Sequence, residues 1–272
     1  MTKEVIKVPP TDGFDIVLVQ GSFDTGLAGL AENGVSLWNA EDFARLRVML
    51  GTSHPVSQRW SWLAEDFNYM NDADADILIA SGAYNPLLKD PASAVQAHRA
   101  GKEVFLADVV ARDLRERAET DPVRARASGV YLLKRKDVKS EIPVTALGEY
   151  GPTRFLFGEQ VTPYGEFLQK ADITSVPFYV VDAKHAQKQE SHFSRAFAVY
   201  CLLDRSPLFG DDNDLRDDDG RVGGVRSYAR EAGAAESSIG NEGSRLEGML
   251  KALKPGETFE HEGAVYARLA KR

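Results

Sequence analysis

The sequence predicts an α/β protein whose first half carries a mostly parallel sheet. As far as residue 139, short apolar runs rich in β-branched residues alternate with amphipathic segments, the order in which helices cover a parallel sheet. Between 140 and 184 the pattern changes to short β-like pieces broken by proline and glycine, which indicates mixed sheet and hairpins. The end of the chain shows a capping box with an apolar stripe and then two short runs around Glu262-Gly263, which predict a C-terminal helix plus a hairpin.

Local signals place the first elements. A buried parallel strand is expected over 14–19, where a run rich in Ile, Val and Leu precedes a glycine. Asn39 suits the N-cap of a helix that ends before Gly51, because acids fill its first turn and apolar side chains recur on one face. A second helix is predicted over 57–70 by the spacing of its large apolar side chains, which are Trp60, Leu63, Phe67 and Met70.

Strands and helices continue to alternate through the rest of this half. An aspartate followed by proline at 90–91 is typical of a helix start, and Gly101 is typical of its end. We expect strands over 76–82, 102–107 and 130–134, and helices over 90–101 and 109–119.

The second half is less regular. Residues 204–243 are polar, include six aspartates between Asp211 and Asp219, and are interpreted as a surface arm. A helix that begins at Ser244 and a hairpin over 258–269 complete the chain. Before the arm, a helix is predicted over 187–203 from four large side chains spaced for one face, Phe193, Phe197, Tyr200 and Leu203.

These signals divide the chain into four parts. They are a Rossmann-like α/β half at 1–139, a mixed β region with one helix at 140–203, an acidic flexible arm at 204–243 and a helix–hairpin unit at 244–272.

Composition limits the class of protein. The 272 residues are 43% apolar and 27% charged, close to an ordinary globular protein, and the net charge of −8 does not favour binding duplex DNA by the whole surface. No apolar run approaches the roughly 20 residues of a membrane helix, and the start MTKEVIKVPP lacks an apolar signal core. With the single cysteine Cys201, this predicts a protein of the cytoplasm, or of a host cytoplasm or virus particle if the chain is viral, without membrane partners.

One stretch carries a candidate catalytic pattern. An apolar run from Pro177 ends in Asp182-Ala183-Lys184, with Asp172 ten residues before Asp182 and Glu166 in an expected helix upstream. This stretch resembles the active-site core of the PD-(D/E)xK nuclease superfamily. In that superfamily two acids on adjacent strands hold a divalent metal ion, and a lysine beside the second acid positions or activates the attacking water.

The resemblance implies a role for each of these residues. Asp172 and Asp182 would ligate Mg²⁺ or Mn²⁺, Lys184 would be the catalytic lysine, and Glu166 would complete the site. The bound metal ion would activate water and stabilise the charge that develops on the phosphate. The implied function is metal-dependent cleavage of nucleic acid, with the basic stretch 134–139 steering the backbone.

Two other function classes stay open, as does the question whether the chain is an enzyme. The hairpins, the acidic arm and the C-terminal unit also fit a non-enzymatic assembly component, for example of a virus particle, that binds a protein partner or a second copy of itself. The alternating first half fits a nucleotide or nucleoside binder, since ligands gather at the carboxyl ends of parallel strands; the residues there are Gly21, Ser81, Gly82 and Asp108.

Overall fold

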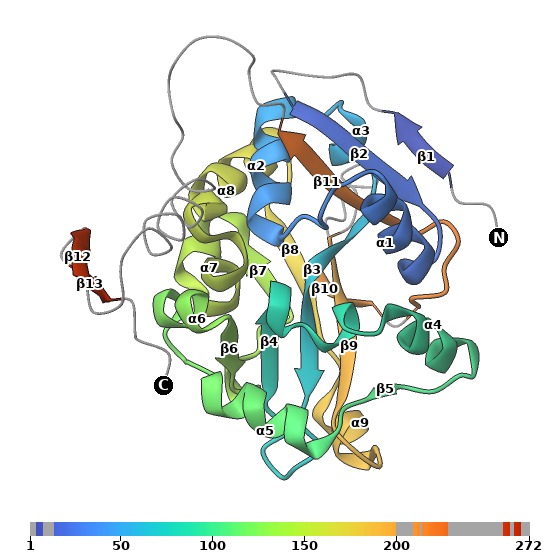
Figure 1. The fold of residues 1–272 in the computed structure, drawn as a ribbon, viewed down its shortest axis with the longest axis vertical. Helices are drawn as coiled ribbons and strands as arrows, with labels where there is room; N and C mark the ends of the chain where they lie inside the picture. The colour runs from blue at the N-terminus through green and yellow to red at the C-terminus, as the bar shows by residue number, and fades with distance from the viewer. Residues whose placement is uncertain are drawn as a thin grey trace. The chain divides into compact units, whose positions relative to one another are not determined.

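Two sheets and the helices that cover them make up the unit Met1–Tyr228, and a second unit spans Ala229–Arg272 (Figure 1). The computed structural model describes residues 4–7, 14–199, 209–212, 214–227, 258–261 and 264–267. The predicted boundaries at 139 and 203 both fall inside the first unit.

Strands alternate irregularly with helices and short 3₁₀ turns. The strands are β1 Glu4–Lys7, β2 Phe14–Gln20, β3 Ser61–Tyr69, β4 Ile77–Ser81, β5 Val104–Phe105, β6 Val130–Leu133, β7 Glu141–Pro143, β8 Ser175–Tyr179, β9 Phe193–Val199, β10 Phe209–Asp212, β11 Arg221–Ser227, β12 Thr258–His261 and β13 Ala264–Ala267. The helices are α1 Phe23–Glu32, α2 Ala40–Leu50, α3 Pro55–Gln58, α4 Pro91–Arg99, α5 Asp108–Arg117, α6 Pro122–Ser128, α7 Gly151–Phe157, α8 Val161–Lys170 and α9 Ala183–Lys188. The 3₁₀ turns are η1 Gly82–Tyr84, η2 Pro86–Leu88, η3 Arg135–Asp137, η4 Val144–Glu149 and η5 Gly158–Gln160.

The large sheet is built around β3 and β9. Its order is β6-β4-β3-β9-β10-β8-β7, and the short strand β5 also pairs with β9. Neighbouring strands run antiparallel except for β8 and β10, which are parallel. The prediction of a mostly parallel sheet is therefore wrong.

A single misassigned segment explains much of that error. Residues 57–70 were expected to form a helix, but most of them form β3, which pairs with β4 as an antiparallel neighbour. Every residue of β3 is buried, so the period-2 alternation that identifies a half-exposed strand is absent. The predicted strand at 14–19 exists as β2, but it pairs antiparallel with β1 and with β11.

Strand β9 was misassigned for a related reason. The helix predicted over 187–203 is instead the end of α9 followed by β9, within the described part of that range. Phe193 and Phe197 are four residues apart, a spacing that fits one face of a helix and also one face of a strand. Both side chains are fully buried on one side of the large sheet, while Ala196 and Ala198 pack on the other.

Other local predictions are confirmed. Helix α2 begins at Asn39, whose side chain accepts a hydrogen bond from the Asp42 N–H, and ends at Gly51 with φ of 82°. Elements β4, β6, α4 and α5 lie where expected, and β12 and β13 form the predicted antiparallel hairpin. Of the strand predicted over 102–107, two residues form β5.

The region after residue 140 differs from its prediction in two places. Helices α7 and α8 occupy much of the segment expected to be mixed sheet. Part of the predicted flexible arm, 209–212 and 221–227, forms β10 and β11, so the arm interpretation is wrong for these residues. The helix predicted from Ser244 lies outside the described residues, as does Cys201.

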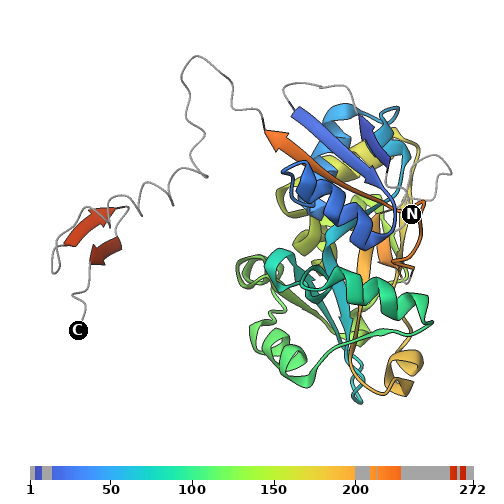
Figure 2. The ribbon, with the colours of Figure 1, turned by 45° about the vertical axis from the view of Figure 1, so that its right-hand side comes forward.

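Helices cover both faces of the large sheet. On one face α2, α7 and α8 lie side by side (Figures 1 and 2), and their aromatic and aliphatic side chains pack against Leu63, Phe67 and Phe197. On the other face α1, α4 and α5 bury smaller clusters that include Trp62 and Leu78. None of the helices that the structure describes is long and apolar enough for a membrane span.

The small sheet brings distant parts of the chain together. β11 pairs along the whole of β2, from Arg221 opposite Gln20 to Ser227 opposite Phe14. Gly223 allows this close approach, because a Cβ atom there would lie 2.2 Å from the Trp38 ring. The Trp38 N–H also donates to the Gly223 carbonyl at 2.9 Å, so the loop before α2 is attached to β11.

Strand β3 buries acids in the centre of the protein. Glu65 and Asp66 are 3% and 0% exposed. Burial raises the pKa of Glu65 to about 8 and the pKa of Asp66 well above its usual range. The Ala40 N–H at the start of α2 donates to both Glu65 oxygens, at 3.0 and 3.2 Å. On the other face, Asn68 donates to Asp66 and accepts from Ser194.

The Gly223→Ala substitution is expected to lower the free energy of unfolding by about 1–3 kcal/mol, because the new methyl group overlaps the Trp38 ring. Gly148→Ala is the matched control, since its nearest neighbour would lie 4.0 Å away. Denaturant unfolding of the two variants measures the difference. Equal stabilities would contradict the close packing of β11 on Trp38.

The raised pKa of Glu65 predicts that the free energy of unfolding depends on pH. Its pKa is raised from 4.5 to about 8 on folding, so its stabilising contribution is complete below pH 4.5 and is lost as pH rises toward 8. The slope attributable to this group is about 1 kcal/mol per pH unit. Glu65→Gln keeps the acceptor for Ala40 and should remove this slope, which unfolding of both proteins between pH 5 and 9 measures. A Glu65→Gln variant with the wild-type slope would contradict this assignment.

Candidate functional site

A break in the strand pairing along one edge of β9 creates the candidate site. β10 pairs with Ala196 to Val199, and β5 pairs with Phe193 and Ser194. Arg195 lies between the two pairings. Glu103, which directly precedes β5, lies next in register opposite Arg195.

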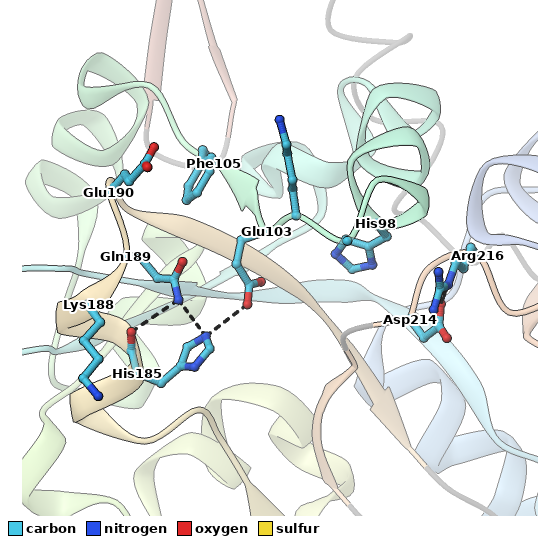
Figure 3. A pocket seen from close by; sticks show the side chains of 11 residues that line it. His98, Glu103, Phe105, His185, Lys188, Gln189, Glu190, Asp214 and Arg216 are labelled. Carbon is cyan, nitrogen blue, oxygen red and sulfur yellow. Dashed lines mark hydrogen bonds and ion pairs between the residues drawn. The ribbon is translucent and has the colours of Figure 1, made fainter.

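A cavity of about 660 Å³ opens at this break and is shown in Figure 3. We call it the Glu103 cavity. Side chains from the α4–β5 connection, the end of α9 and the turn before β11 line it, and most of them are charged or polar. Its lining residues are His98, Gly101, Lys102, Glu103, Phe105, His185, Lys188, Gln189, Glu190, Asp214 and Arg216.

Glu103 is held on two sides. Arg195 donates to it through Nε at 3.1 Å and through Nη2 at 2.5 Å, a two-pronged contact between side chains that are 13% and 14% exposed. His185 Nε2 lies 3.2 Å from the same carboxylate. Burial alone would raise the pKa of Glu103, but Arg195 and His185 outweigh it, and the pKa is lowered. Glu103 is therefore an ionised, fixed acceptor at neutral pH.

Helix α9 places His185 beside Glu103. Asp182 is its N-cap and accepts from the His185 N–H at 2.9 Å, which orients the first turn. Gln189 Nε2 lies 2.8 Å from His185 Nε2, the nitrogen that also faces Glu103 (Figure 3). One ring nitrogen cannot donate to the carboxylate and accept from the amide at once, so the position of the proton decides which contact forms.

His98 anchors the opposite wall. It lies on the buried side of α4, and its Nδ1 accepts from the Leu215 N–H at 3.1 Å. Burial lowers the pKa of His98, so the ring is neutral and keeps this acceptor at neutral pH. The contact fixes the turn that carries Asp214 and Arg216, which form an ion pair at 2.9 Å.

Several lining groups remain available for a ligand. Phe105 is 43% exposed although it belongs to a strand. Lys102, Lys188 and Glu190 form no ion pair with another of the described residues. The cavity thus combines a rigid polar floor, one aromatic surface and charges of both signs.

Comparison with known proteins identifies the fold. Neither a family model nor a curated protein matches the sequence. One solved structure, described as "Accommodation of massive sequence variation in Nanoarchaeota by the C-type lectin fold", aligns with a TM-score of 0.58 and 12% sequence identity. The alignment covers 78% of this chain and 97% of that one. This chain has the C-type lectin fold.

This lectin fold distributes the residues of the nuclease pattern over separate elements. Glu166 lies on the exposed side of α8, and Asp172 lies in the turn after it with φ of 60°. Asp182 caps α9, where the backbone N–H of His185 is the main cause of its lowered pKa. Lys184 is exposed in the first turn of α9.

No metal centre is formed by these residues in the described part of the chain. Nowhere in that part do three or more His, Cys, Asp or Glu side chains gather as metal ligands. The Mg²⁺ or Mn²⁺ site and the nuclease activity stay predictions from sequence. The predicted nucleotide site loses its structural basis, since it depended on a parallel sheet.

The residues of the Glu103 cavity carried no sequence signal. Glu103 and Arg195 are 92 positions apart, and Arg195 lies in a segment that was predicted to be a helix. His185 lies on α9 and Gln189 directly follows that helix, but Glu103 lies 82 positions before His185. Only the pairing of β5 with β9 brings these groups together.

Arg195→Met is expected to lower the free energy of unfolding by about 1–3 kcal/mol, because it leaves the half-buried Glu103 carboxylate without its guanidinium partner. Adding Glu103→Gln should recover most of this loss, since no buried charge then remains. Arg45→Met is the control and should cost less than about 1 kcal/mol, because its ion pair with Asp42 is exposed. Equal losses in the two single variants would refute a buried Glu103–Arg195 pair.

Proposed function

We propose that this chain is a binding protein that recognises a polar ligand in the Glu103 cavity. The observation that carries this proposal is the fixed carboxylate of Glu103, held by Arg195 and His185 at the base of a wide polar opening. Such pre-oriented groups reduce the entropy that is lost when a ligand is bound.

The lining chemistry agrees with binding. Phe105 offers an exposed ring surface, Gln189 offers an amide, and Lys102 and Lys188 offer ammonium groups. A few oriented polar groups beside an aromatic side chain are typical of recognition sites. The proposal belongs with the non-enzymatic interaction class that the sequence left open, and it adds the Glu103 cavity as the proposed binding surface.

The neighbour in the C-type lectin fold supports the same interpretation. That protein is described as accommodating massive sequence variation by this fold. In the present chain, Lys102, Lys188 and Glu190 extend from connections and a helix end, whereas the core side chains lie beneath them. Changes in these exposed side chains would leave the core intact and alter what the cavity binds.

Arrays of synthetic glycans and of short peptides test this proposal. The wild-type chain should bind a subset of probes, and Phe105→Ala and Gln189→Ala should each weaken that binding about tenfold or more. Tyr179→Ala is the matched control, since Tyr179 is an aromatic residue 58% exposed outside the cavity. Binding that survives both cavity variants, or no binding to any probe, would overturn the proposed site.

A further inference from the structure

A second, smaller pocket lies on the α2 side of the large sheet. It encloses about 260 Å³ between β3, α2, α6 and α7, and we call it the Glu65 pocket. Buried residues form its base, while Glu41, Arg126 and Gly82 form a partly exposed rim. Its volume equals roughly nine water molecules at about 30 Å³ each, enough for a small ligand group.

The base of the Glu65 pocket is a carboxyl group with few partners. Glu65 is 3% exposed, and its two oxygens accept only from backbone N–H groups, those of Ala40 and of Glu65 itself. Two carboxylate oxygens offer about four acceptor positions. Acceptor capacity therefore remains on Glu65 at the point where the pocket reaches it.

The cation at the rim is already occupied. Arg126 donates through Nη1 to the Phe155 carbonyl at 2.8 Å and through Nη2 to the Glu41 carboxylate. Glu41 also accepts from the Glu159 N–H at 3.1 Å. Arg126 lowers the pKa of Glu65 through space, but its hydrogen bonds go to Phe155 and Glu41 and not to Glu65.

The remaining walls combine apolar side chains with two polar ones, Asn39 and Ser81. Leu37, Ala64, Phe155 and Leu156 line the space between the rim and the carboxyl group. A passage with apolar side chains along part of its walls and one acid at its end suits a ligand that has an alkyl stem and a terminal positive charge. A charged head with an aliphatic stem, as in lysine or arginine, has this form.

We propose that the Glu65 pocket binds a primary ammonium or guanidinium group on an alkyl stem, with Glu65 as its counterion. The source is either a free amine or a basic side chain of a partner. In the empty pocket Glu65 is protonated at neutral pH, since its pKa is about 8. A bound cation stabilises the carboxylate, so binding releases a proton.

The charged and polar groups around Glu65 determine how the affinity for a cation depends on pH. Burial is the main cause of the raised pKa, with Asp42 on α2 adding to it, while the Ala40 N–H and Arg126 on α6 act in the opposite direction. Below pH 8 the ionised fraction of Glu65 falls roughly tenfold per pH unit, and the affinity for a cation should fall in parallel.

Calorimetric titration of the full chain with n-butylammonium and n-butylguanidinium tests the proposal. Affinity should rise roughly tenfold per pH unit from pH 6 to pH 8 and level off above it. At pH 7, titrations in phosphate and in HEPES, neither of which contains a primary amine, should report release of close to one proton. Butan-1-ol, which has the stem without the charge, should not compete.

Glu65→Gln should fold, because it keeps the acceptor for Ala40, and should bind n-butylammonium at least tenfold more weakly at pH 8 without the pH dependence. Glu116→Gln, on the exposed side of α5, is the control and should bind as wild type does. No binding by wild type at pH 8, equal binding by Glu65→Gln, or a flat pH profile would each overturn the proposal.

Two further probes distinguish the sources of the cation. If a basic side chain of a partner is the ligand, N-acetyl-lysine methylamide should bind more tightly than n-butylammonium, because the partner's backbone also contacts the rim. If a free amine is the ligand, the added amide groups should reduce the affinity. If butan-1-ol displaces n-butylammonium or N-acetyl-lysine methylamide, the positive charge is not what the pocket recognises, and the proposal is overturned for both sources of the cation.

Discussion

Burial of strand β3 on both faces is the constraint on which the rest of the structure depends. All nine residues from Ser61 to Tyr69 are buried, although three of them are Glu65, Asp66 and Asn68. An isolated ionised carboxylate in such a place would cost many kcal/mol, and burial raises the pKa of Glu65 to about 8 and the pKa of Asp66 well above its usual range. Several polar atoms of this strand have hydrogen-bond partners on neighbouring elements. These partners fix the neighbouring elements, because Glu65 holds the start of α2 and Asn68 connects β3 to β9 and β4.

A comparison of Glu103 and Glu65 shows how the local environment decides whether a carboxyl group is charged. Glu103 is ionised because Arg195 meets both of its oxygens and compensates for burial. Glu65 lies deeper, has only backbone N–H groups as donors, and stays neutral to about pH 8. The first therefore acts as a fixed anion in the wall of a wide polar cavity. The second is a group that ionises only when a counterion reaches it, and the two sites consequently favour different ligands.

The sequence predicted those elements whose signals are local. The helix from Asn39 to Gly51 has a cap, acids in its first turn and a terminal glycine, and all of these signals agree with the structure. β3 and β9 could not be distinguished from helices, because complete burial removes alternation and because Phe193 and Phe197 fit either period. Because β3 was assigned to a helix, the first half of the chain matched the alternation of strands and helices that is typical of a parallel sheet, and the sheet was wrongly predicted to be parallel.

The sites were harder to predict because they depend on register between distant segments. The Glu103 cavity exists where β5 stops pairing with β9 and β10 begins, and this break places Glu103 opposite Arg195. The nuclease pattern had the opposite property, since its acids are close in sequence but lie on α8, in a turn and at the cap of α9. Asp182 is nevertheless needed locally, because its cap orients the turn that carries His185 into the cavity. The local sequence pattern therefore identified Asp182, which supports the site through its cap. The pair of Glu103 and Arg195 could be found only from the pairing of β5 with β9.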